Sequence, residues 1–310
     1  MSLTRQLGIE FPILQAPMAG VQGGDLAVAV CEAGGLGALP CAMLSPEAMV
    51  DELQRIRAAT AKPLNVNFFC HAPPAPDEVR LQRWHQALAP YYAEYGLDID
   101  NIAAGAGRRP FDHEACDALA AFRPEVVSFH FGLPEPALVE RVKAWGAVVL
   151  SSATTVEEAC WLEAHGVDAV IAQGAEAGGH RGMFLSEDVT SQLGTFALLP
   201  QVVEAVSVPV VAAGGIADAR GVAAALALGA SAVQVGTAFL CCSEATTSTL
   251  HRQALLSEAA RHTALTNLYT GRPARGILTR LMRELGPLSD VAPAFPLATS
   301  AIAPLRSAAE

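Results

Sequence analysis

Eight short apolar runs recur along the 310 residues of this chain, and most of them are separated by segments that contain residues typical of helix starts and ends. Apolar runs without polar alternation are typical of parallel strands that are buried on both faces. Strands that alternate with helices form either a closed (β/α)8 TIM barrel or an open doubly wound sheet, and eight evenly apolar strands favour the barrel. The expected strands are Ile13–Ala16, Leu36–Leu39, Leu64–Phe69, Val126–Phe129, Val148–Ser151, Ala169–Ala172, Val210–Ala213 and Ala232–Val235.

Several intervening segments carry residues that begin or end helices. Residues 45–47, Ser-Pro-Glu, supply an N-cap, a proline for the first helical position and an acid for the first turn. Thr155 and Glu158 have the spacing of a capping box. An alanine-rich helix is expected over residues 219–228, closed by a glycine. These signals place helices between the expected strands.

The chain is expected to form a single domain over residues 1–310. The only long interruption, residues 70–124, follows the third strand and includes an expected helix over Asp77–Tyr95. An insertion at the carboxyl end of a strand lies at the mouth of a barrel, where it forms a lid or adds packing to the rim. After the barrel, a helical tail is expected over residues 246–310.

Composition excludes some classes of function. Lys and Arg number 20 against 31 Asp and Glu, a net charge of −11, which argues against binding to nucleic acid or to an anionic membrane surface. The sequence shows no signal peptide and no apolar run long enough to span a membrane. The seven cysteines include no C-x-x-C pair and the eight histidines show no ligand-like spacing, so we expect reduced thiols, a cytoplasmic protein and no metal site.

One histidine stands in an unusually glycine-rich loop. The stretch A-Q-G-A-E-A-G-G-H-R-G over residues 172–182 follows the sixth expected strand and contains His180. Glycine lets the backbone approach a ligand without side-chain collision. A histidine at the exit of a strand in such a loop is suited to proton transfer. The alternative is a flexible turn with an incidental surface histidine.

Two glycine turns end the last two expected strands. In barrels of this kind, phosphate binds at the loops after strands seven and eight. Glycines there leave backbone N–H groups bare beside a following helix start, and such N–H groups bind anions. The sequence therefore predicts a phosphate site formed by the two turns, which contain Gly214, Gly215, Gln234, Val235, Gly236 and Thr237.

Polar amides occur at strand positions where an apolar residue is expected. Asn65 and Asn67 point to the same side of the third strand, and Gln173 follows the sixth. A buried amide without a partner costs about 1–3 kcal/mol, so we expect these amides to face partners; which asparagine meets a ligand stays open. Met18, after the first strand, carries a soft thioether that suits either a flat apolar ring or core packing.

Five motifs occur in a fixed order: Q-A-P-M-A-G at 15–20, N-V-N at 65–67, the glycine loop at 172–182, A-A-G-G-I-A-D at 212–218 and Q-V-G-T at 234–237. Together they resemble the nitronate monooxygenases, formerly called 2-nitropropane dioxygenases, a family of FMN-dependent (β/α)8 barrels. T-G-R-P-A-R-G at 270–276 also resembles the segment that follows the barrel in this family. The resemblance covers nearly all of the chain.

The resemblance implies a flavin site. Asn67, Gln173 and Gly178 would contact the flavin, while Gly215 and residues 234–237 would hold the phosphate and ribityl chain of FMN. The phosphate position agrees with the one inferred from the two glycine turns.

The resemblance also implies the activity. His180 would be the catalytic residue, which either takes a proton from the carbon beside a nitro group or assists an anionic nitronate. Arg181 would help to attract that anion, with a solvent-facing arginine as the alternative. The expected reaction is oxidation of an alkyl nitronate, such as propionate 3-nitronate, by O2 to a carbonyl product and nitrite. The expected partners are small molecules, with a homodimer as the alternative to a monomer.

The tail departs from the family pattern. Nitronate-oxidising members bring tyrosines and a lysine into the pocket at four-residue spacing, whereas the corresponding positions here are Phe295, Thr299 and Ala303. This difference removes two phenols and one cation, and it bears on the choice of substrate rather than on the flavin site.

Three other functions agree with parts of the pattern. An NADH-dependent flavin reductase, such as an enoyl-thioester or quinone reductase, shares the E-A-G-G-H type of loop. A barrel that binds FMN or a phosphorylated metabolite without catalysis would leave His180 dispensable. A phosphate-handling isomerase or an IMP-dehydrogenase-like barrel would explain the glycine turns in a colourless protein.

Overall fold

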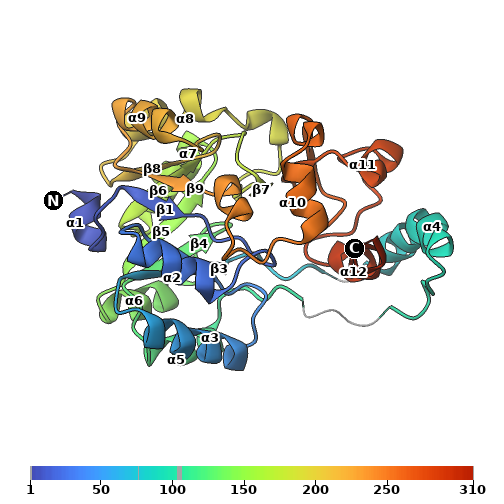
Figure 1. The fold of residues 1–310 in the computed structure, drawn as a ribbon, viewed down its shortest axis with the longest axis horizontal. Helices are drawn as coiled ribbons and strands as arrows, with labels where there is room; N and C mark the ends of the chain where they lie inside the picture. The colour runs from blue at the N-terminus through green and yellow to red at the C-terminus, as the bar shows by residue number, and fades with distance from the viewer. Residues whose placement is uncertain (1, 76, 103–106, 310) are drawn as a thin grey trace. The chain divides into compact units, whose positions relative to one another are not determined.

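The computed structural model describes residues 2–75, 77–102 and 107–309 (Figure 1). The chain forms two compact units, which are described separately. The barrel unit comprises Met1–His71, Arg109–Gly178 and Gly182–Thr247, and the tail unit comprises Ala72–Arg108, Gly179–Arg181 and Ser248–Glu310.

The barrel unit is built on an eight-stranded parallel sheet in the order β1-β9-β8-β6-β5-β4-β3-β2. A parallel bridge between Leu14 and Leu36 joins β1 to β2, so the sheet closes on itself. The expected (β/α)8 barrel is therefore confirmed. Its strands are β1 (Ile13–Gln15), β2 (Gly37–Pro40), β3 (Leu64–Phe69), β4 (Val126–His130), β5 (Val148–Ala153), β6 (Ala169–Gln173), β8 (Val210–Ala213) and β9 (Ala232–Val235).

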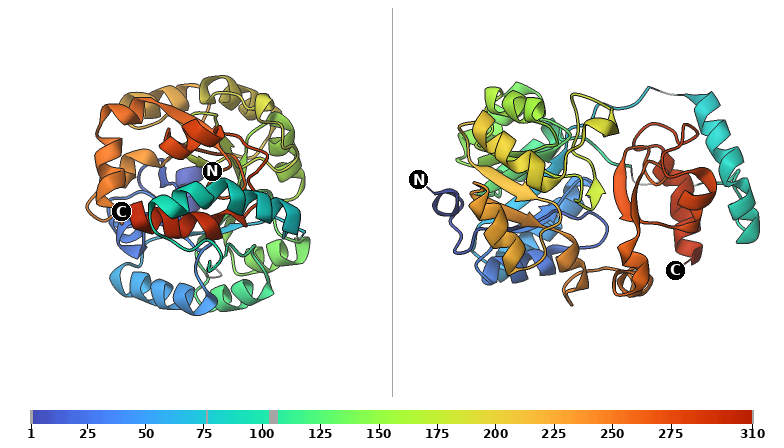
Figure 2. Two further views of the ribbon diagram at one scale, coloured as in Figure 1. Left: turned by 90° about the vertical axis from the view of Figure 1, so that its right-hand side faces the viewer. Right: turned by 90° about the horizontal axis from the view of Figure 1, so that it is seen from above.

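Helices surround these strands. In the left view of Figure 2, helices coloured from blue through green to yellow lie around the circumference. This arrangement buries the outer faces of the strands against helices, as continuous apolar strands require. The helices of the barrel unit are α1 (Leu3–Leu7), α2 (Gly24–Glu32), α3 (Pro46–Ala59), α5 (His113–Ala120), α6 (Pro136–Ala144), α7 (Val156–Ala164), α8 (Thr195–Ala205) and α9 (Ala219–Ala227), with 3-10 helices η1 (Val189–Ser191) and η2 (Thr237–Cys241).

Alternation along the strands separates two environments. Outward residues such as Val66 and Phe68 join a large core beneath the helices, whereas inward residues such as Leu36 and Ile171 form a smaller apolar cluster inside the barrel. Toward the carboxyl ends of the strands, the inward positions become polar. These polar positions include Asn67, Ser128, Ser152, Gln173 and Gln234. The interior of the barrel is therefore apolar at one end and polar at the end where ligands bind in this fold.

The tail unit has its own core and its own sheet. Its antiparallel strands have the order β10-β11-β7, and its apolar cluster includes Trp84, Tyr92 and Met282. Its elements are β7 (Gly179–His180), β10 (Thr263–Thr266), β11 (Ala274–Ile277), α4 (Glu78–Glu94), α10 (Thr249–Leu255), α11 (Arg280–Leu285), α12 (Ala298–Ala309) and the 3-10 helix η3 (Glu258–Arg261).

The tail contains the expected helices and, in addition, two strands that the sequence did not predict. The segments T-A-L-T and A-R-G-I are short and mostly half-buried, so they lack the continuous apolar character that identified the barrel strands. Residues 72–108 of the expected insertion belong to the tail unit, while α5 belongs to the barrel unit. The single domain over residues 1–310 and the lid both stay predictions.

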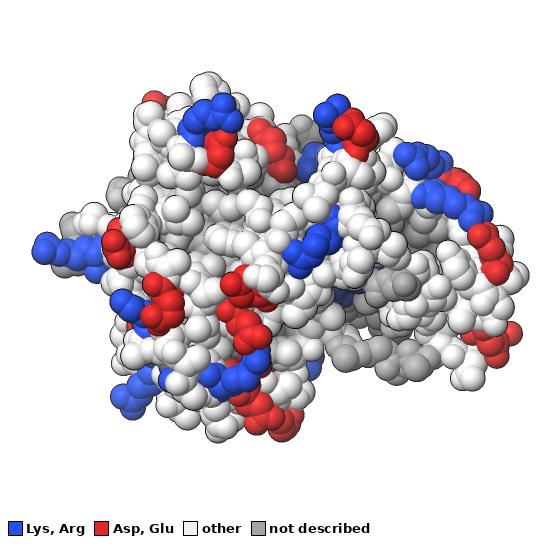
Figure 3. All heavy atoms as spheres, in the orientation of Figure 1, with Lys and Arg blue, Asp and Glu red and all other residues white. Residues whose placement is uncertain are grey.

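No described helix is long and apolar enough to cross a membrane, and no cluster of described residues offers a metal site. The cysteines are free thiols. On the face drawn in Figure 3, Lys and Arg side chains lie among Asp and Glu side chains rather than in a separate basic patch.

The predicted helix caps form, one of them in an altered way. The Ser45 hydroxyl accepts a hydrogen bond from the Ala48 N–H, and the Thr155 hydroxyl accepts one from the Glu158 N–H. Glu158 does not complete the capping box through the Thr155 N–H. Instead, its Oε2 accepts from both the N–H and the hydroxyl of Thr154, each at 2.7 Å.

The Glu158 carboxylate also ties two loops together. Its Oε1 accepts from the N–H groups of Phe184 (2.6 Å) and Leu185 (3.2 Å), and the side chain is only 1% exposed. This carboxylate therefore fixes the chain after the glycine loop to the end of β5.

We predict that Glu158→Ala lowers the free energy of unfolding by about 3 kcal/mol, because it leaves several buried donors without an acceptor. Glu158→Gln keeps one carbonyl oxygen and is expected to lose less. The control is Glu157→Ala, at the exposed neighbouring position. Urea denaturation followed by circular dichroism measures the differences, and equal stability of the 158 and 157 alanine variants would contradict this role.

Candidate active site

The glycine loop begins and ends beside β6. The side-chain Oε1 of Gln173, the last residue of β6, accepts a hydrogen bond from the Gly182 N–H at 2.8 Å. A Cβ atom on Gly182 would lie 2.9 Å from Cε1 of His130 and 3.0 Å from Cβ of Ser152. Only glycine fits at position 182, because the backbone there lies directly against the carboxyl ends of β4 and β5.

The first glycine turn packs against the start of α8. Gly214 and Gly215 have φ angles of +116° and +70°, in the region that favours glycine. A Cβ atom on Gly214 would lie 2.8 Å from Thr195 Oγ1 and 3.0 Å from the Ala177 nitrogen. The carboxylate of Glu176 accepts from the N–H (2.7 Å) and the hydroxyl (2.9 Å) of Thr195. The turn after β8 and the loop after β6 therefore form one packed assembly.

The second glycine turn lies beside the end of β1. A Cβ atom on Gly236 would lie 3.4 Å from Cβ of Ala16 and 3.8 Å from Sδ of Met18. A Cβ atom on Gly178 would lie 3.2 Å from Thr237 Oγ1. The barrel thus brings together four residues that the sequence analysis selected from three separate motifs.

The helix starts near the two turns differ from the expected arrangement. After the first turn, α9 begins only at Ala219, and the Asp218 carboxylate caps it by accepting from the Gly221 N–H at 2.9 Å. This bond, with that of Arg220, holds the pKa of Asp218 below its ordinary value, so the cap is an anion. After the second turn, η2 begins directly at Thr237. A helical N-terminus is therefore adjacent to the second turn only.

The buried amides have different environments. The Asn67 amide donates to the backbone oxygen (3.1 Å) and the hydroxyl (3.0 Å) of Ser128 on β4. Asn65, 1% exposed, has no hydrogen-bond partner for either amide atom among the described residues. Oε1 of Gln234 is also buried without a partner in the described part of the chain. The expectation that the amides face partners is confirmed for Asn67 and Gln173. Asn65 has no partner among the described residues, and which asparagine meets a ligand stays a prediction.

His180 lies in a strand rather than in a flexible turn. It pairs with Ala274 of β11, and its Nε2 lies 2.9 Å from Thr270 Oγ1. The ring of Phe295 packs edge-on against the imidazole, with 5.4 Å between ring centroids and an interplanar angle of 83°. The next residue, Arg181, is fully buried and its N–H donates to the Pro273 oxygen, so the solvent-facing alternative for Arg181 is wrong.

The three altered tail positions have different surroundings. Phe295 is buried against His180, and Thr299 on α12 accepts a hydrogen bond from Arg108 at 2.7 Å. Ala303, also on α12, is exposed. Two residues that were not predicted contact these side chains. Thr270, which bonds to His180, lies in the motif at 270–276, whereas Arg108, which contacts Phe295 and Thr299, carries no signal in the sequence.

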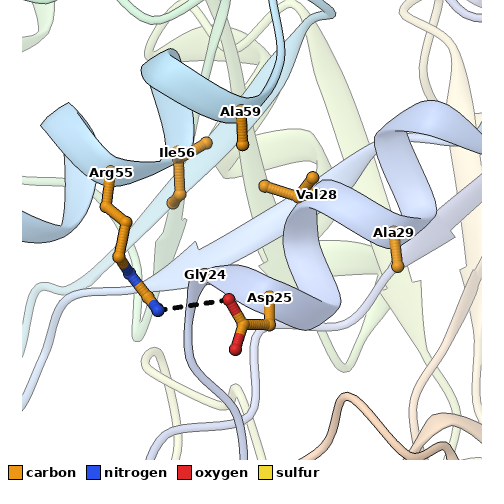
Figure 4. Close-up of a pocket in the computed structure, with 7 residues that line it drawn as sticks. All are labelled: Gly24, Asp25, Val28, Ala29, Arg55, Ile56 and Ala59. Carbon is orange, nitrogen blue, oxygen red and sulfur yellow. Dashed lines mark ion pairs between the residues drawn. The ribbon is translucent and has the colours of Figure 1, made fainter.

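The pocket shown in Figure 4 does not belong to this site. It lies between α2 and α3 of the barrel unit, and an ion pair of 3.2 Å joins Arg55 to Asp25 at its edge. Both charged side chains are more than half exposed, and none of the predicted site residues lines the pocket.

Similarities to known proteins cover the whole chain. A family model described as nitronate monooxygenase matches residues 1–310. The chain is 44% identical over 313 residues to a nitronate monooxygenase of Paraburkholderia phytofirmans, covering 98% of this chain and 84% of the relative. A solved nitroalkane oxidase from Streptomyces ansochromogenes has a TM-score of 0.88 and 43% identity, covering 97% of this chain and 86% of the other. FabK from Thermotoga maritima has a TM-score of 0.70 and 31% identity, covering 92% and 77%.

We predict that Gly214→Ala lowers the free energy of unfolding by about 2–4 kcal/mol, because the new Cβ meets Thr195 and the φ angle disfavours alanine. Gly276→Ala is the matched control, because nothing lies within 4 Å of its Cβ position, and its stability is expected to change by less than about 1 kcal/mol. Thermal unfolding of both variants tests the prediction, and an unchanged midpoint for Gly214→Ala would contradict it.

Proposed function

The chain belongs to the nitronate monooxygenase family, and from that premise we propose that it is an FMN-dependent enzyme that oxidises alkyl nitronates with O2 to a carbonyl product and nitrite. The observation that carries the proposal is the setting of His180. This histidine follows the sixth barrel strand, bonds to Thr270 and packs against the apolar ring of Phe295.

The residues present fit FMN. Glycine is required at position 214, and a side chain at 178 would fill the space beside Thr237, so two stretches of bare backbone border the carboxyl end of the barrel. The buried Oε1 of Gln234 offers an acceptor to a hydroxyl or N–H of a bound group. In the proposal, Gly215 and residues 234–237 hold the phosphate and ribityl chain.

The flavin end would meet a second set of residues. Asn67, Gln173 and Gly178 would contact the ring system, and the thioether of Met18 beside Gly236 suits a flat apolar surface. When bound, FMN would supply the redox chemistry that links oxidation of the nitronate to reduction of O2. The protein supplies orientation and proton handling.

His180 would serve as the base for neutral nitroalkanes. A ring nitrogen accepts the proton as the C–H bond beside the nitro group breaks, and the electron pair moves onto the nitro group to form the nitronate. The Thr270 hydroxyl can donate to a neutral Nε2 or accept from a protonated one, so this contact suits both states of the imidazole. Thr270 is therefore a positioning residue, and a nitronate supplied as the anion needs no deprotonation.

An NADH-dependent flavin reductase remains the second candidate, favoured by the likeness to FabK and by the E-A-G-G-H type of loop. The proposed substrates are small molecules and O2, and the cytoplasmic location and the homodimer stay predictions. The two candidate reactions differ in the electron donor, which makes them separable by one measurement.

We predict that His180→Asn keeps the flavin but lowers kcat/KM for neutral nitroalkanes by about 100-fold or more, since it removes the base. Turnover of the preformed nitronate is expected to fall less. The control His262→Asn changes an exposed histidine of the tail unit and is expected to leave both rates unchanged. Unaltered nitroalkane turnover in His180→Asn would exclude the role as a base.

We predict that anaerobic propionate 3-nitronate bleaches the visible absorption of the oxidised flavin, while NADH does so slowly or not at all. Stopped-flow spectra of the purified protein, after FMN is added back where needed, make the measurement. Rapid bleaching by NADH with no response to the nitronate would favour the reductase. Failure to bind FMN at all would overturn the cofactor.

A further inference from the structure

Arg108 is a half-buried cation that has no counter-charge among the described residues. Its Nη1 donates to Thr299 Oγ1 at 2.7 Å, and its Cζ lies 5.9 Å from the centre of the Phe295 ring. Its Nε is buried without an acceptor, and no carboxylate forms an ion pair with it among the described residues. Burial lowers the pKa of the guanidinium, but an arginine stays charged far above neutral pH.

The neighbouring arginine has a different environment. Arg109 is exposed and its Nη2 pairs with both Asp112 (2.8 Å) and Glu114 (2.6 Å). Two carboxylates therefore pair with Arg109, which is exposed to water, whereas none of the described carboxylates pairs with Arg108, which is half-buried. Withdrawing a cation from water without a partner is unfavourable, so the setting of Arg108 is suited to an anion that arrives with a ligand.

Arg108 and His180 lie against the same aromatic ring. Phe295 contacts the imidazole edge-on and lies beneath the guanidinium, and all three residues belong to the tail unit. A ligand that presents its reacting carbon to His180 can therefore extend along Phe295 toward Arg108. The cation–π contact and the Thr299 bond hold the guanidinium, while its Nε bonds to none of the described residues and can donate to such a ligand.

We propose that Arg108 binds an anionic group of the substrate remote from the reacting carbon, above all a carboxylate, and so makes the enzyme selective for nitronates that carry a second negative charge. The inference rests on the proposed function. It also assigns a role to the altered tail. Phe295 and Thr299 contact Arg108, and this cation takes the place of the lysine that the family pattern has at the position of Ala303.

A purely structural role for Arg108 is less consistent with the contacts. Thr299 uses one donor of the guanidinium, and a lysine or an amide would supply that single bond equally well. A guanidinium presents five donors in a planar fork that matches a carboxylate in a bidentate way. The buried Nε, which has no acceptor among the described residues, lies on one edge of that fork.

The test compares two nitronates of equal chain length, propionate 3-nitronate and the nitronate of 1-nitropropane, which lacks the carboxylate. Arg108→Gln removes the charge and keeps a side chain that can bond to Thr299; Arg108→Lys restores the charge without the fork. Arg109→Gln is the matched control at the adjacent, exposed position. Flavin content and circular dichroism establish that each variant is folded and loaded.

We expect Arg108→Gln to raise KM for propionate 3-nitronate about 10- to 100-fold with little change in kcat, because a charge-assisted bond made in the bound substrate is lost. For the nitronate of 1-nitropropane, KM and kcat of Arg108→Gln are expected to stay within about twofold of the unaltered enzyme. Arg108→Lys is expected to recover part of the loss on propionate 3-nitronate. Arg109→Gln is expected to behave as the unaltered enzyme. Equal losses on both nitronates, or no loss on either, would overturn the proposal.

A binding measurement separates this proposal from the reaction itself. Succinate is a non-reacting dianion of similar length, and calorimetric titration is expected to show binding that weakens at least about tenfold in Arg108→Gln and not in Arg109→Gln. If the unaltered enzyme oxidises neither nitronate, the proposed function fails, while the succinate titration still tests Arg108. Equal succinate affinity in all variants would overturn the anion site even where nitronates are oxidised.

Discussion

Closure of the parallel ladder is the constraint on which the rest of the structure depends. Because all eight strands point the same way around the barrel, their carboxyl ends share one rim, where Asn67, Gln173 and Gln234 replace the apolar residues of the other end. The two glycine turns and the loop before His180 start from this rim. Each short motif would be unremarkable in isolation, and the closed sheet is what assembles them.

The second constraint is the departure of residues 179–181 from the rim to become an edge strand of the tail sheet. His180 is thereby held by Thr270, which lies 90 positions further along the chain, and by Phe295 beyond it. Since residues of the tail unit make these contacts, changes in the tail unit alter the surroundings of the proposed base. In the proposal, substrate choice can therefore vary while the residues that would hold the flavin are unchanged, and the setting of Arg108 is an instance of this separation.

The predictions that succeeded rest on local signals. Val210–Ala213 and Leu64–Phe69 were located to the residue, because a strand buried on both faces must be continuously apolar. The N-caps at Ser45 and Thr155 formed because a hydroxyl next to a first helical turn meets a free N–H within a few residues. The predictions that were wrong depend on distant contacts. Glu158 does not bond to the Thr155 N–H; it accepts hydrogen bonds from Thr154 and Phe184 instead, because a distant loop supplies further donors.

The sequence by itself determined the barrel, the glycine turns and the identity of His180 as the candidate base, because periodicity, backbone freedom and side-chain chemistry are properties of short segments. Only the tertiary structure decided what His180 touches, that Arg181 is buried, and that Arg108 lies over Phe295 without a carboxylate among the described residues. Those facts depend on contacts between segments far apart in the chain, whose pairing is set by packing and by the register of the strands rather than by any local pattern.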